Sequence, residues 1–98
     1  MDEPLKIEDF KPHVGKIVRF RGTRYALPLE RIISDRKRLP KWVKRRPFIL
    51  IFVGPKEREV LPEGTYECEF EDGPVYEMYV NPIHTPEPGR QEYQSVFN

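Results

Sequence analysis

The basic segment from Arg31 to Arg46 has the strongest chemical character in this sequence. It holds eight lysines and arginines and a single acid, Asp35. Cationic side chains at this density can each neutralise a phosphate, and the indole ring of Trp42 among them can stack on a nucleic-acid base. The segment thus predicts a salt-sensitive nucleic-acid contact. The residues that would make it are Arg36, Lys37, Arg38, Lys41, Trp42, Lys44, Arg45 and Arg46.

Three features of the same sequence count against nucleic-acid binding. The sequence pI is only 7.9. Strongly acidic strands are expected in the same small domain. Trp42 stands at helical spacing from Leu39 and Val43, so the three side chains can pack onto the core as one short amphipathic turn. Nucleic-acid binding is therefore kept as an alternative function.

Charge is divided unevenly along the chain. Residues 1–46 hold 14 lysines and arginines against 6 acids, whereas residues 47–98 hold 3 against 10, so the net charge of +1 conceals two oppositely charged halves. Such asymmetry is typical of a surface for nucleic acid or for a charged protein partner. In an antiparallel fold the two halves interleave, and their mutual neutralisation across strands explains the pattern equally well.

The acids of the second half form a row along one predicted strand. Glu67, Glu69 and Glu71 alternate and so share its outer face, which is the pattern of a solvated acidic face. A hydrolytic pair of carboxylates needs an environment that separates the two pKa values, such as an apolar pocket. Nothing in the surrounding sequence suggests such a pocket, so we expect no catalytic role for this row.

Other reactive groups are too few or too scattered for catalysis or metal binding. His13 and His84 stand far apart, and neither belongs to a zinc-ligand motif. Cys68 is the only cysteine, and its place in an alternating strand predicts a buried, unreactive thiol. Nucleophile motifs and glycine-rich phosphate loops are absent. We therefore expect no enzyme activity, no catalytic residue, no metal site and no cofactor.

The elements that position these groups follow from hydrophobic spacing. A short helical turn is expected over Ile7–Val14, because its apolar residues recur on one face and Gly15 follows as a stop. Pro28 indicates either an edge position or a bulge in the second strand, and the pair Ile32-Ile33 also fits a bulge there. The expected strands are residues 16–21, 25–33, 48–53, 65–70, 75–80 and 91–98, with a basic loop over 34–46 and a proline-rich loop over 81–90.

The most buried strand is expected at residues 48–53, which are all apolar. Alternate side chains point to opposite sides of a strand. The side expected to face the core carries Phe48, Leu50 and Phe52. The other side carries Ile49, Ile51 and Val53.

The second side of this strand predicts a cover, because a single-core β domain normally has a polar outer side. Burial of each aliphatic side chain there is worth roughly 2 kcal/mol. The candidate covers are residues 39–43, the helical turn, and a partner subunit. If a partner subunit is the cover, the predicted partner-binding residues are Ile49, Ile51, Val53, Trp42 and Tyr79.

The hairpin after the strand at residues 65–70 can be predicted from register. A two-residue loop would place Glu77 opposite Cys68, inside the core. A three-residue loop over residues 71–73 instead pairs Cys68 with Tyr76. We expect the three-residue loop, with Gly73 as the left-handed residue that such loops require.

These elements predict an all-β fold, a small six-stranded antiparallel barrel or sandwich with a short N-terminal helical turn, as a single domain over residues 1–98. No apolar run is long enough for a membrane span. The N-terminus is charged and does not match a signal peptide, which is expected of a cytoplasmic protein or of one assembled into a particle or fibre. Scarce asparagine and glutamine beside 11 prolines are typical of thermophilic proteins.

Several strand and turn motifs together resemble a known family. They are Asp9-Phe10, Val14-Gly15-Lys16, residues 46–55, 61–66 and 80–82, and the terminal Tyr-Gln-Ser-Val-Phe-Asn. Over nearly the whole chain this pattern is similar to a small bacterial family of single domains of unknown function. The resemblance implies a genomic setting beside phage-tail-collar or microcystin-dependent-type proteins, and it brings no catalytic residues.

We therefore predict a non-enzymatic structural or accessory subunit of a larger protein assembly, of phage-tail-like or extracellular-fibre type, that acts through protein–protein contacts. The partner would be another copy of the chain or a tail- or fibre-like protein. A carbohydrate- or ligand-binding β module is a second alternative. Its aromatic platforms would be Tyr25, Trp42, Tyr76, Tyr79 and Tyr93.

Overall fold

A computed structural model of the chain describes residues 5–34 and 47–97. The elements follow one another as the helix α1 (Ile7–Phe10), a 3₁₀ turn η1 (Lys11–His13) and the strands β1 (Ile17–Phe20), β2 (Ala26–Ser34), β3 (Phe48–Pro55), β4 (Gly64–Phe70), β5 (Val75–Ile83) and β6 (Arg90–Phe97). The helical turn and the strands expected from hydrophobic spacing are confirmed.

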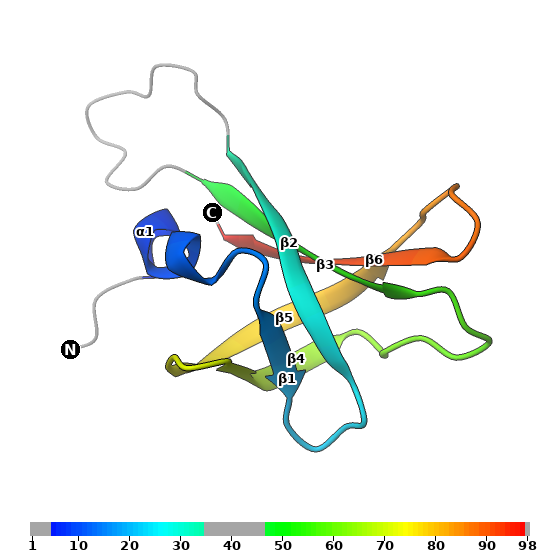
Figure 1. The fold of residues 1–98 in the computed structure, drawn as a ribbon, viewed down its shortest axis with the longest axis horizontal. Helices are drawn as coiled ribbons and strands as arrows, with labels where there is room; N and C mark the ends of the chain where they lie inside the picture. The colour runs from blue at the N-terminus through cyan, green and yellow to red at the C-terminus, as the bar shows by residue number, and fades with distance from the viewer. Residues whose placement is uncertain (1–4, 35–46, 98) are drawn as a thin grey trace.

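The strands close into an antiparallel barrel in the order β1-β2-β3-β6-β5-β4 (Figure 1). Consecutive strands pair except β3 and β4: β3 pairs with β6, and β4 closes the barrel against β1. The predicted all-β antiparallel fold is therefore correct, and of the two forms expected the barrel is the one present. α1 lies at one end of the barrel beside the last residues of β6.

The core is a single cluster of side chains that point inward by strand alternation. Along β3 the inward residues Phe48, Leu50 and Phe52 are buried, as expected. Phe10 of α1 enters the same core, where its ring lies 5.7 Å from that of Phe48 and 5.4 Å from that of Phe97. The N-terminal turn therefore fills the barrel end and contacts the inner side of β3.

A bulge in β2 changes which residues face outward. The register with β3 shifts between Leu29 and Arg31, so the extra residue is Glu30, and neither Pro28 nor the Ile32-Ile33 pair forms the bulge. Beyond the bulge the inward-facing residues change from odd-numbered to even-numbered positions. Ile32 packs against the core, and Ile33 is exposed. A bulge in this strand was expected, but its predicted position was wrong.

The β4–β5 hairpin has the predicted three-residue loop. Cys68 pairs with Tyr76, and Phe70 N–H donates to the Pro74 carbonyl at 3.1 Å. The prediction for Gly73 was wrong, because the residue with positive φ is Asp72, at 55°. Gly73 is needed for another reason: a Cβ at this position would lie 2.5 Å from Cε1 of His13.

The proline-rich loop predicted over residues 81–90 is shorter than expected. Its first three residues extend β5 as far as Ile83 and pair with β6 between Glu92 and Gln94. Pro82 is tolerated there because the even-numbered residues of β5 direct their backbone groups toward β4, whose pairing with β5 ends at Val80, so the missing N–H costs no hydrogen bond to β6. This extension is what joins β5 to β6 and closes the barrel.

Candidate interaction surfaces

An exposed row of apolar side chains crosses three strands on the outer face of the barrel. Ile33 of β2 lies opposite Ile49 of β3, which lies opposite Val96 of β6. Ile33 is 45% exposed, Val96 is 47% exposed, and Ile49 between them is half-buried. We call these three residues the apolar row. Its neighbours Ser34, Pro47, Phe48 and Phe97 join it in lining a groove of about 250 Å³.

The other two outward residues of β3 lie outside the apolar row. Ile51 is 2% exposed, although it lies outside the main core cluster, and in register it stands between Arg31 and Gln94. Val53 is half-buried opposite Glu92. Of the three predicted contact residues on β3, the structure therefore places only Ile49 in an exposed apolar surface.

Ile33 and Val96 were not predicted as members of this surface. The outward position of Val96 could have been predicted from strand alternation, because Tyr93, Ser95 and Phe97 point inward and Val96 therefore points outward. Ile33 could not have been found in the same way, since its outward direction depends on the bulge at Glu30.

Four charged residues beside the apolar row form a compact ion cluster: Glu30, Arg31, Arg90 and Glu92. Arg90 bonds Glu92 at 2.6 Å and also contacts Glu30. Arg31 bonds Glu92 at 3.2 Å and contacts Glu30 as well. The hydrogen bond from Arg90 is the main cause that lowers the pKa of both carboxyls, and Arg31 lowers them further. The cluster balances its own charge and joins β2 to β6.

The acidic face is partly neutralised by Arg21, the residue that follows β1. Glu67 and Glu69 point outward from β4, and Arg21 bonds them at 3.0 and 3.4 Å. Together with Arg24, which lies 3.8 Å from Glu57 and 3.7 Å from Glu59, this pairing joins residues of the basic first half to residues of the acidic second half. Neutralisation across strands therefore accounts for part of the charge asymmetry.

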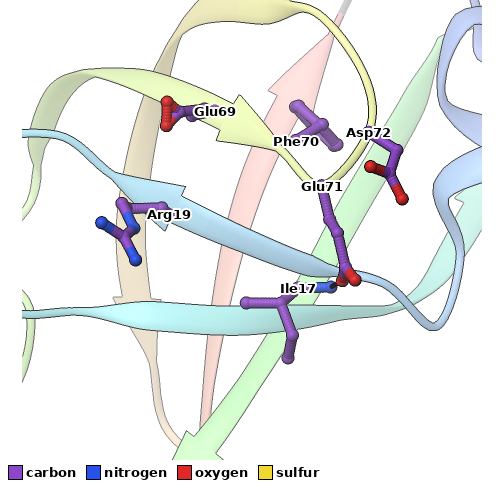
Figure 2. A pocket seen from close by; sticks show the side chains of 6 residues that line it. All are labelled: Ile17, Arg19, Glu69, Phe70, Glu71 and Asp72. Carbon is purple, nitrogen blue, oxygen red and sulfur yellow. Dashed lines mark hydrogen bonds between the residues drawn. The ribbon is translucent and has the colours of Figure 1, made fainter.

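Glu71 differs from the other two acids of the predicted row, because it lies in the turn after β4. Its Oε2 accepts a hydrogen bond from the backbone N–H of Ile17 at 3.3 Å. Figure 2 shows this carboxylate beside β1, at the edge of a depression of about 620 Å³. The depression is lined by Ile17, Arg19, Glu69, Phe70, Glu71 and Asp72.

The aromatic residues named as platforms are divided between core and surface. Tyr93 is buried, and its hydroxyl accepts a hydrogen bond from Leu61 N–H at 3.1 Å. Tyr25 and Tyr76 are partly buried against the core. Tyr79 is 52% exposed and contacts Glu63 through its hydroxyl. Tyr25 and Tyr93 line one small pocket of about 180 Å³ without Tyr76 or Tyr79, so the tyrosines in the described residues do not form one shared sugar-binding platform.

Two predicted sites lie outside the described residues. The basic loop residues from Arg36 to Arg46, with Trp42 among them, fall between the described ranges. Their nucleic-acid and partner contacts stay predictions.

The reactive side chains within the described ranges do not assemble into a site. Cys68 is fully buried, and burial raises the pKa of its thiol to about 12. His13 packs against the ring of Phe70 at 5.1 Å, with Nδ1 buried and without a hydrogen-bond partner. No three His, Cys, Asp or Glu residues in the described ranges come together as a group that could hold a metal ion. No helix there is long and apolar enough to cross a membrane.

Comparison with protein families identifies the fold unit that carries these surfaces. The family model described as "Domain of unknown function (DUF6916)" matches residues 5–97. The chain belongs to the DUF6916 family. The match runs from the residues before α1 to the end of β6, so the whole barrel with its N-terminal turn is the DUF6916 domain. Searches of curated proteins and of solved structures found no match.

Proposed function

We propose that this DUF6916 domain is a non-enzymatic accessory subunit of a larger protein assembly and that it docks through the apolar row. The observation that carries the proposal is the adjacency of Ile33, Ile49 and Val96 on one outer face, with Ile33 and Val96 nearly half exposed. Contiguous exposed apolar surface is characteristic of protein interaction sites. Each such side chain contributes about 1.5–3 kcal/mol when it becomes fully buried.

Two further features support a protein partner. The ion cluster beside the apolar row balances its own charge, so a polar rim flanks the apolar surface, as in many interfaces. The sequence resemblance also implies a setting beside phage-tail-collar or microcystin-dependent-type proteins. An assembly of phage-tail-like or extracellular-fibre type is the partner class that such a setting favours.

Site-specific photo-crosslinking in cells tests this proposal. A photoreactive amino acid at position 33 should give one discrete protein adduct, identified by mass spectrometry and then purified. Binding of that purified partner should weaken at least about tenfold in the Ile33→Glu variant. Val14→Glu is the matched control, because Val14 is 43% exposed between η1 and β1 and does not belong to the apolar row. An adduct with the chain itself identifies self-assembly; no adduct, or equal weakening by both variants, contradicts the proposal.

Nucleic-acid binding through the basic segment is the alternative. It is supported by the eight lysines and arginines between Arg31 and Arg46. A fluorescence titration with single- and double-stranded oligonucleotides at low salt tests it, and no binding under these conditions removes it.

A further inference from the structure

Among the described strands, β5 between Val75 and Tyr79 has a paired neighbour on one side only. Over these residues β5 pairs with β4, from Glu69 opposite Val75 to Thr65 opposite Tyr79. On its other side β5 pairs with β6 only at Asn81–Ile83. Figure 1 shows the two strands meeting at that end and diverging toward the start of β5, while β6 pairs with β3 along its whole length.

The backbone groups of three residues face this open edge. Phe70 N–H bonds the Pro74 carbonyl, so the even-numbered residues of β5 exchange hydrogen bonds with β4. In an antiparallel ladder the intervening residues direct N–H and C=O to the other side. These residues are Val75, Glu77 and Tyr79. An exposed row of such groups is a template for an added strand.

The side chains along the edge define which strand would fit. Val75 and Tyr79 are exposed apolar residues on either side of the exposed Glu77. Glu77 lies opposite Glu67 in register. Like charges placed directly opposite each other are destabilising, and Arg21 bonds Glu67 but has no bond to Glu77 among the described contacts. A basic side chain beside Glu77 would relieve this repulsion.

We infer that the β5 edge accepts an extended basic segment of a partner protein as an added strand. The segment would place Lys or Arg beside Glu77 and apolar residues beside Val75 and Tyr79. A second copy of this edge is a poor occupant, because antiparallel pairing centred on Glu77 brings two glutamates together. The inference deepens the proposed interaction role, but it uses a surface separate from Ile33.

A pair of synthetic peptides tests this inference. The probes are the blocked peptides Thr-Val-Thr-Lys-Thr-Val-Thr and Thr-Val-Thr-Glu-Thr-Val-Thr, titrated into the ¹⁵N-labelled domain, because alternate residues of a strand share one face. The basic peptide should shift the amide signals of Val75, Glu77 and Tyr79 and bind about tenfold more tightly than the acidic one. Glu77→Lys should reverse the preference, whereas Glu87→Lys, at an exposed position in the loop before β6, should leave it unchanged.

Three outcomes contradict the inference. They are shifts confined to other strands, equal affinity for both peptides, and concentration-dependent changes at Val75–Tyr79 without peptide, which would assign the edge to a second copy. Ile33→Glu separates this inference from the proposed docking role, because Ile33 lies on β2 and its replacement should not alter peptide binding.

Discussion

The contact between Gly73 and His13 shows how the residue type tolerated at one position can depend on a side chain that is distant in the chain. The His13 ring lies where a side chain at position 73 would begin, 2.5 Å from an added Cβ. Phe70 supports the other side of the ring. The φ of Gly73 is not positive, so this glycine is required by close packing and not by backbone conformation.

Replacement of Gly73 by alanine should therefore destabilise the domain by about 1–3 kcal/mol through overpacking. In a His13→Ala background the same replacement should cost little, since the obstructing ring is gone and alanine reduces the entropy of the unfolded chain. Urea unfolding of the four variants of this double-mutant cycle measures the coupling. An equal cost in both backgrounds would show that the contact with His13 is not the cause.

At the scale of elements, the bulge in β2 brings charges together across strands. Glu30 is the extra residue, and Arg31 follows it on the outer face opposite Ile51. Glu92 of β6 and Arg90 then complete the ion cluster. The cluster spans β2 and β6 across β3, so it stabilises the tertiary arrangement of three strands rather than one pair.

The ion cluster predicts a specific pH dependence. The folded-state pKa values of Glu30 and Glu92 lie below the ordinary value of 4.5. Their stabilisation is therefore fully present above that value and is lost as pH falls through the lowered folded-state values. Glu92→Gln should lower the urea midpoint at pH 7, and the difference from wild type should shrink as pH falls below about 4.

Glu87→Gln is the matched control for this experiment. Glu87 also contacts Arg90, at 3.7 Å, but its side chain is 69% exposed, and exposed ion pairs contribute little. Its urea midpoint should therefore stay close to that of wild type across the pH range. If the urea midpoint of Glu92→Gln differs from that of wild type by the same amount at every pH, ionisation of the cluster is not the cause of the lost stability.

At the scale of the whole molecule, Phe10 connects the N-terminal turn to the barrel. Its ring contacts Phe48 of β3, Phe70 of β4, Tyr76 of β5 and Phe97 of β6. At this end of the barrel β3 stays paired with β6 and β4 with β5, whereas β5 and β6 are no longer paired with each other. One side chain from outside the sheet thus completes the core.

Phe10→Ala should destabilise the domain by about 3–5 kcal/mol, because it removes a fully buried ring and leaves a cavity among four strands. The shift in the denaturant midpoint at constant m-value measures the loss. Val14→Ala, in the same N-terminal region but exposed, should change stability by less than about 0.5 kcal/mol. Similar losses in both variants would contradict the role of Phe10 as part of the core.

Much of the fold could be predicted from local pattern. The alternation of residues 65–70 and the polar loop after them determine the register in which Cys68 meets Tyr76, because a slip by one residue would bury Glu77. The candidate surface was harder to predict. The outward position of Ile49 follows from the alternation of β3. The outward direction of Ile33 depends on the bulge at Glu30, which the sequence pattern had placed at Pro28 or at Ile32-Ile33.

The sequence by itself determined the all-β class, the strands, the hairpin register and the inward face of β3, since these depend on period-2 alternation and on turn residues close to one another in the chain. Tertiary structure alone decided three other features: the closure of the barrel, the burial of Ile51 as opposed to the exposure of Ile33 and Val96, and the open edge at Val75–Tyr79. The physical reason is that accessibility and strand pairing depend on neighbours distant in sequence, and local periodicity does not specify them.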